Sequence, residues 1–135
     1  MEGLSAVGLK LTDWLAGAFR GLRRVKALAH RGALVATNQP CIFVNVTNLS
    51  RDRSVEITHV WLDTQPQIQI LNPERPLPRR LAPDETWETW LPLEVVPKNQ
   101  RGEVLERGRV RLSNGRTIPT RENKAIPHVG QVPGP

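Results

Sequence analysis

The sequence contains no tyrosine and only one cysteine, Cys41. A single cysteine cannot form an internal disulfide, which excludes the class of small disulfide-stapled domains and favours a reducing, cytoplasmic compartment. With 135 residues the chain is long enough to bury a core without such staples. Cys41 opens an apolar run, so we expect a buried, inert thiol.

Motifs of catalysis and metal binding are also lacking. The chain has no Gly-rich phosphate loop, no nucleophile elbow and no His-Glu-X-X-His run, and its histidines (His30, His59, His128) are far apart. Neighbouring carboxylates such as Asp84 and Glu85 point to opposite faces if they lie on a strand. The sequence therefore predicts no catalytic residue, metal ligand or cofactor, and a protein that is not an enzyme.

No apolar run is long enough to cross a membrane, because Lys10 and Asp13 interrupt the stretch from Leu4 to Leu22. Its apolar residues instead recur at spacings of three and four, which predicts an amphipathic helical leader over residues 1–22. Such a helix must bury its apolar stripe. The sequence leaves three surfaces open: the rest of the fold, a partner helix or second copy of the chain, and a membrane interface.

Between Cys41 and Thr120 the sequence does have short runs of apolar/polar alternation, for example at Ile42, Val44 and Val46. About seven such runs, separated by turn residues, predict a mainly β fold: an immunoglobulin-like antiparallel β-sandwich over residues 23–121. Residues 122–135 are rich in proline and glycine and are expected to form a tail. The expected strands cover residues 25–29, 41–48, 55–63, 67–71, 87–96 and 106–120, with a further strand near residue 34.

Two of these strands are ambiguous in detail. Over residues 55–63, strict alternation buries His59 and Trp61, whereas a bulge near Thr58 buries Val60 and Leu62 instead. The sequence does not decide between them.

Over residues 87–96, alternation places Trp87 in the core together with Leu93 and Val95, and leaves Trp90 exposed. Over residues 106–120, a three-residue loop, Ser113–Gly115, would place Val110 opposite Ile118 and keep apolar residues together.

Charge is concentrated at the two ends of the chain. Residues 1–36 carry six basic and two acidic groups and residues 98–135 carry eight and three, whereas residues 37–97 carry five and eight. If both ends lie on one side of the fold, they form a basic patch for phosphate or an acidic partner. The candidate anion-binding residues are Arg23, Arg24, Arg107, Arg109, Arg111 and Arg116. The chain has no tyrosine and neither phenylalanine lies among these arginines, so no base-stacking platform is expected.

Four segments carry a family resemblance: residues 43–50 (FVNVTNLS), 56–61 (EITHVW), 75–81 (RPLPRRL) and 81–87 (LAPDETW). The last resembles the turn-then-strand element of bacterial immunoglobulin-like modules. Together they are similar to small uncharacterised bacterial proteins of that kind. The resemblance covers about half of the chain and implies a fold but no activity.

We therefore expect a non-catalytic protein-interaction module that presents loops or a sheet edge and self-associates through its leader. Aromatic and arginine side chains dominate protein interfaces, which makes the candidate partner-binding residues Trp61, Arg75, Arg79, Arg80 and Trp90. The partner itself is unknown from sequence. The alternative is a binder of nucleic acid or of an anionic membrane surface through the arginine-rich ends, with peripheral membrane association.

Overall fold

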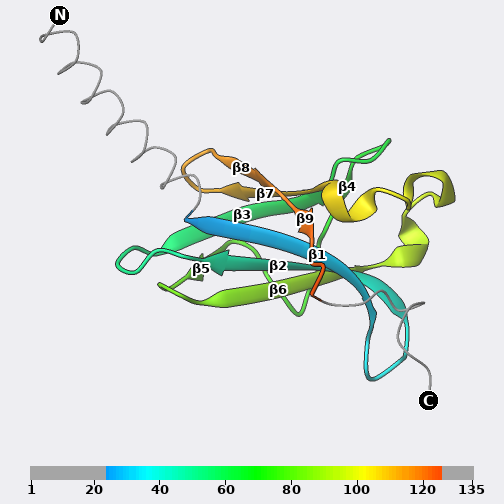
Figure 1. Ribbon diagram of the computed structural model, residues 1–135, viewed down its shortest axis with the longest axis horizontal. Helices are drawn as coiled ribbons and strands as arrows, with labels where there is room; N and C mark the ends of the chain where they lie inside the picture. The colour runs from blue at the N-terminus through cyan, green and yellow to red at the C-terminus, as the bar shows by residue number, and fades with distance from the viewer. Residues whose placement is uncertain (1–23, 126–135) are drawn as a thin grey trace, which may run out of the picture.

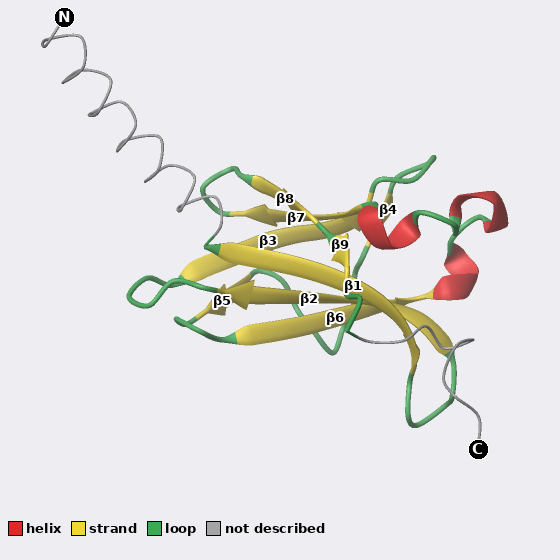
Figure 2. Ribbon diagram, in the orientation of Figure 1, coloured by secondary structure: helices red, strands yellow, loops and turns green. Residues whose placement is uncertain are grey.

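The computed structural model describes residues 24–125, which form nine strands and three short 3-10 helices (Figure 1). The predicted leader, Arg23 and most of the predicted tail lie outside the described residues. Within them the protein is mainly β and contains two sheets (Figure 2), which confirms the predicted class.

The first sheet has the order β6-β2-β1-β9. β1 and β6 pair antiparallel with β2, while β9 lies parallel to β1. The bounds of its strands are β1 Val25–Ala33, β2 Pro40–Asn48, β6 Thr86–Pro92 and β9 Arg121–Glu122. β1 is one continuous strand where the sequence suggested two.

The second sheet has the order β4-β3-β7-β8, and β5 also pairs with β3. Its strands are β3 Val55–Leu62, β4 Ile68–Gln69, β5 Arg79–Leu81, β7 Gly108–Leu112 and β8 Thr117–Pro119. Three 3-10 helices connect β6 to β7: η1 Leu93–Val95, η2 Lys98–Gln100 and η3 Val104–Glu106.

Inward-facing residues of both sheets form one core. Val44 and Val46 of β2 pack in the same cluster as Ile57 and Val60 of β3 and Val110 of β7. All five are at most 1 % exposed. Burying this apolar surface contributes roughly 25 cal/mol per Å² and is the main force that holds the two sheets together.

The bulge in β3 is present. The register between β3 and β7 shifts between Ile57 and His59, after which Val60 and Leu62 point inward and His59 is exposed. Of the two interpretations left open by the sequence, the bulge is therefore confirmed.

Trp87 is 5 % exposed and belongs to the core, as predicted. The predicted strand is too long, however, because β6 ends at Pro92 and the chain turns into η1. Pro92 has no backbone N–H to continue a ladder, and Val96 N–H donates to Leu93 O within the turn. Val95 is consequently 47 % exposed.

The β7–β8 hairpin has the predicted register, with Val110 opposite Ile118. Leu112 N–H donates to Arg116 O at 2.9 Å and closes the three-residue loop. Gly115 has a φ of 88°, which is the left-handed conformation that this loop requires at its third position.

After β8 the chain leaves the second sheet and joins the first. Thr120 N–H donates to Gly108 O, and its hydroxyl donates to Leu105 O at 2.7 Å. Asn123 N–H then donates to Ala29 O, beside the parallel pairing of β9 with β1. The C-terminal part of the described chain therefore lies against its N-terminal strand.

In residues 24–125 the longest helices are single 3-10 turns, and none is long and apolar enough to cross a membrane.

Candidate functional site

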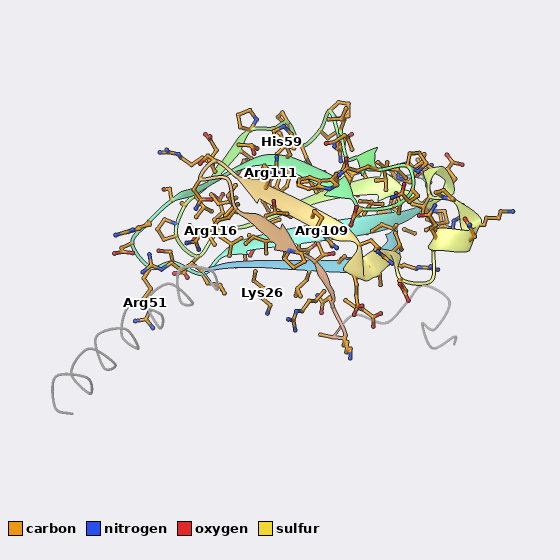
Figure 3. The ribbon with its side chains drawn as sticks, turned by 90° about the horizontal axis from the view of Figure 1, so that it is seen from above. Lys26, Arg51, His59, Arg109, Arg111 and Arg116 are labelled. Atoms are coloured by element: carbon orange, nitrogen blue, oxygen red, sulfur yellow. The ribbon has the colours of Figure 1, made fainter. Side chains whose placement is uncertain are left out.

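The pairing of β9 with β1 brings the two basic ends of the chain together. Leu28 of β1 lies opposite Arg121, and Lys26 is exposed two residues earlier. Figure 3 shows Lys26 together with Arg109, Arg111 and Arg116 in one view of the molecule. We name Lys26, Arg109, Arg111, Arg116 and Arg121 the basic side.

Arg111 is held in place by a tryptophan. Its guanidinium carbon lies 5.2 Å from the ring centroid of Trp61. The residue directly opposite Trp61 on β7 is Arg109, two residues before Arg111. A cation over an indole face is attracted to it by about 0.5–2 kcal/mol. Trp61 is only 8 % exposed, so Arg111 rather than Trp61 reaches solvent here.

The other predicted anion-binding residues are engaged to different degrees. Arg107 forms an ion pair with Glu103 at 3.1 Å. Arg109 lies 3.7 Å from Asp63 and donates to the carbonyl oxygens of Glu106 and Gly108.

By contrast, no carboxylate of the described chain lies within ion-pair distance of Arg111 or Arg116. Arg24 precedes β1, and Arg23 lies outside the described residues. Arg24, Arg111 and Arg116 are thus the members of the predicted set that form no ion pair within the described residues.

The predicted partner-binding residues Arg75 and Trp90 meet at the β6 edge of the first sheet, the edge away from β9. The Arg75 guanidinium lies 4.7 Å over the Trp90 ring. Trp90 lies opposite Phe43, at 6.1 Å between ring centroids, and Phe43 stacks on His30 at 5.1 Å. We name Arg75, Trp90, Phe43 and His30 the aromatic row; it crosses β6, β2 and β1 on their outer face.

Sequence reasoning missed the two inner members of this row. Phe43 alternates with the core residues Ile42 and Val44, which already placed it on the outer face. His30 lies directly opposite Phe43, a pairing that depends on the β1–β2 register. Gly32 leaves room for the stack, because a Cβ there would lie 2.8 Å from Phe43 Cε2.

The edge of β6 is covered at its centre by the loop that carries Arg75. Arg75 Nε donates to the backbone oxygen of Glu88 at 3.0 Å, so the loop before β5 folds against this edge. Such a contact protects an edge strand from pairing with other chains. The outer face beside β6, rather than its edge, is therefore the accessible feature.

Arg79 and Arg80 have different environments. Arg79 forms an ion pair with Glu85 at 2.8 Å, and the hydrogen bond from Ala82 N–H together with Arg79 lowers the pKa of the Glu85 carboxyl. Arg80 is exposed and lies opposite Glu56. Neither joins the aromatic row, so the structure does not bring the five predicted partner-binding residues together.

Polar atoms without partners lie in the row, beside it on β2 and in the loop that supplies Arg75. His30 Nδ1, Asn45 Oδ1 and Asn72 Nδ2 are buried and form no hydrogen bond with any described residue. Burial lowers the pKa of His30, against the opposing effect of the Glu88 carboxylate. An unsatisfied buried polar atom costs about 1–3 kcal/mol of stability.

A hollow of about 260 Å³ adjoins Arg75 on the side of the loop. Its lining includes Leu71, Pro73, Pro76 and Leu77, and Leu71 is 81 % exposed. The hollow and the aromatic row meet at Arg75; within the row Phe43 is only 9 % exposed, whereas Arg75, Trp90 and His30 are partly exposed. We name this surface, the row together with the hollow, the Arg75 surface.

The described residues contain no cluster of three or more His, Cys, Asp or Glu side chains that could hold a metal ion. A larger polar hollow lies near η2 and η3, where Gln65 and Gln100 exchange hydrogen bonds at 2.7 Å. Two carboxylates line it, and both are engaged: Glu103 pairs with Arg107 at 3.1 Å, and Asp63 lies 3.7 Å from Arg109.

No protein-family model, curated protein or solved structure matches the chain.

Proposed function

We propose that this protein is a non-catalytic protein-interaction module built on an immunoglobulin-like β-sandwich. The strand order supports this assignment. β1, β2 and β6 share one sheet and β3, β7 and β8 share the other, which is how strands A, B, E and strands C, F, G are divided in immunoglobulin domains; β4, β5 and β9 are additional short strands. A buried, unpaired Cys41 fits the cytoplasmic location that the sequence predicts.

The observation that carries the proposal is the Arg75 surface. Arginine and tryptophan are the residue types most enriched among interface hot spots. Here the two are stacked on each other, so both are held in place before a partner arrives. Preorganised side chains lose less entropy on binding, which leaves more of the contact energy for affinity.

The chemistry of the Arg75 surface fits an extended peptide segment of a partner protein. Leu71 and Leu77 offer an apolar hollow for one side chain of the peptide, and Trp90 offers a ring for the next.

Selection from a library of displayed peptides tests this function on the full chain. We expect enriched peptides that bind wild type at least about 30-fold more tightly than Trp90→Ser or Arg75→Gln, because a hot-spot residue contributes 2 kcal/mol or more. Arg116→Gln is the matched control, since it removes one exposed arginine elsewhere and should leave affinity within about twofold. Failure to enrich any peptide, or equal loss in the control, would contradict the proposal.

Self-association through the leader remains a prediction, because residues 1–22 lie outside the described residues. Light scattering of the full chain over a range of concentrations measures it, and a monomer at every concentration would contradict it.

A further inference from the structure

We propose that Asn114 is a site of covalent self-modification, at which the loop between β7 and β8 deamidates spontaneously to aspartate and isoaspartate. Asn114 is the only asparagine of the sequence that precedes a glycine. Asn114 and Gly115 are both exposed in this loop, which belongs to the second sheet, whereas the Arg75 surface lies on the first (Figure 1). The inference therefore stands independently of the proposed function.

The reaction needs only the side chain, the peptide bond that follows it and water. The backbone nitrogen of Gly115 attacks Cγ of Asn114 and loses its proton, and the side-chain nitrogen leaves as ammonia, which closes a five-membered succinimide ring. Water then adds to one of the two ring carbonyls and breaks its bond to the ring nitrogen. Opening at Cγ gives aspartate, and opening at the main-chain carbonyl gives isoaspartate. No oxidation or reduction takes place.

The loop holds the amide of Asn114 next to the nitrogen that must attack it. Arg116 N–H donates to Asn114 Oδ1 at 3.0 Å, so the side chain folds back over the following peptide bonds instead of extending into solvent. A donor on this oxygen also stabilises the negative charge that develops there as the nitrogen attacks. Gly115 has no Cβ to hinder the approach. The electrophile is therefore in place in the folded chain.

The same loop withholds the nucleophile. Gly115 N–H donates to Leu112 O at 2.9 Å, and this bond must open before the nitrogen can lose its proton and attack. One such hydrogen bond lowers the open fraction about fivefold. Deamidation of the native chain therefore proceeds through transient opening of the loop, and its rate reports on that opening.

Asn123 is a matched site within the same chain. Ala125 N–H donates to Asn123 Oδ1 at 3.1 Å, which is the contact that Arg116 makes with Asn114. The next residue is Lys124, whose N–H forms no hydrogen bond with any described residue. Asn123 therefore has a placed amide and a free backbone nitrogen, and the Cβ of Lys124 is what hinders ring closure there.

Two further asparagines lack a requirement of the reaction. Asn48 is 0 % exposed, and its amide nitrogen donates to the backbone oxygens of Arg53, Leu81 and Ala82. Asn72 precedes Pro73, whose nitrogen carries no proton to lose. The exposed residues Asn38 and Asn99 precede glutamines, which hinder ring closure as Lys124 does.

Deamidation changes the charge and, in the isoaspartate form, the length of the loop. A carboxylate appears two residues before Arg116, which forms no ion pair within the described residues. Isoaspartate also inserts one carbon atom into the main chain of a loop that Leu112 N–H closes on Arg116 O at 2.9 Å. Loss of that bond should lower the thermal midpoint by about 4 °C or more.

Incubation of the full chain at mildly alkaline pH, followed by peptide mapping with mass spectrometry, tests the inference. We expect the mass gain of an NH2-to-OH exchange at Asn114 and not at Asn123, and methylation of the product by an isoaspartate-specific methyltransferase. In guanidinium chloride Asn114 should react at least about fivefold faster, because Gly115 N–H is then free. Asn114→Gln should abolish the signal, because its ring would have six members and closes far more slowly.

The variant Lys124→Gly is the matched control for the hydrogen bond on the nucleophile. It removes the hindering Cβ beside Asn123 and leaves the contact of Ala125 N–H with Asn123 Oδ1 in place. Asn123 should then become modified in the native chain, about fivefold faster than Asn114, because no hydrogen bond occupies the attacking nitrogen. Circular dichroism melting confirms that each variant is folded.

Three results would overturn the inference: earlier modification of another asparagine in the wild-type chain, an equal rate at Asn114 in the native and unfolded chains, and an unmodified Asn123 in the folded Lys124→Gly variant.

Discussion

Replacing Gly108 with alanine tests the close contact between Gly108 and Thr120, where the chain crosses from the second sheet to the first. Gly108 is the first residue of β7, and its backbone oxygen accepts a hydrogen bond from Thr120 N–H, where the chain crosses from β8 to β9. A Cβ at Gly108 would lie 2.6 Å from both Cγ2 and Oγ1 of Thr120. Thr120 is 2 % exposed and its hydroxyl donates to Leu105 O, so it cannot simply turn away.

The expected destabilisation follows from two contributions. Overpacking a well-filled site costs about 1–3 kcal/mol. Displacement of the Thr120 hydroxyl from Leu105 O costs about 1 kcal/mol more, because the buried carbonyl loses its donor. Gly108→Ala should therefore lower the free energy of unfolding by about 2–4 kcal/mol, a large part of the 5–15 kcal/mol typical of a domain.

Urea unfolding followed by tryptophan fluorescence measures this change. Gly102→Ala is the control, because a Cβ there meets no atom within 4 Å, and it should stay within about 0.5 kcal/mol of wild type. In a Thr120→Ala background the atoms at 2.6 Å are gone, so Gly108→Ala should then cost less than about 1.5 kcal/mol. A Gly108→Ala protein as stable as wild type, or an equal loss of unfolding free energy in both backgrounds, would refute the packing of Gly108 against Thr120.

Three further predictions concern other sites. Cys41 is 1 % exposed and burial raises the pKa of its thiol, so we expect it to react with a thiol reagent only after unfolding; rapid labelling of the native chain would contradict its burial. Burial lowers the pKa of His30 below 6.5, so the contribution of the neutral imidazole to stability is full above pH 6.5 and is lost as pH falls through the lowered pKa. Urea midpoints measured between about pH 8 and 5 should fall accordingly, and His30→Gln should reduce this pH dependence. Gly115→Ala should lower the free energy of unfolding by about 1–2 kcal/mol, because φ is 88° there, and an unchanged thermal midpoint would show that the loop has another conformation.

The longer strands could be predicted from the sequence because period-two alternation and turn residues both describe them. β2 and the β7–β8 hairpin have the expected positions, and in the hairpin only one register keeps Val110 beside Ile118. The bulge in β3 was visible as two competing alternations. It was decided by the pairing with β7, which sequence alone does not contain.

The features that create the two candidate surfaces could not be predicted, because they depend on contacts between distant segments. β9 is two residues long, too short for any periodic signal, and its position depends on Thr120 and on Asn123 N–H donating to Ala29 O. The aromatic row depends on the registers of three strands. Sequence reasoning selected Arg75 and Trp90 by residue type, whereas their stacking follows from the fold of the loop over β6.

Nuclear magnetic resonance mapping of a selected peptide on the full, isotope-labelled chain tests the central claim most directly. The Arg75 surface predicts that the largest shifts occur at the Trp90 indole N–H and at backbone amides near Phe43, Arg75 and Asn72, with the Trp61 indole unchanged. Shifts centred on Trp61 and Arg111 instead, or shifts spread evenly over both sheets, would contradict it.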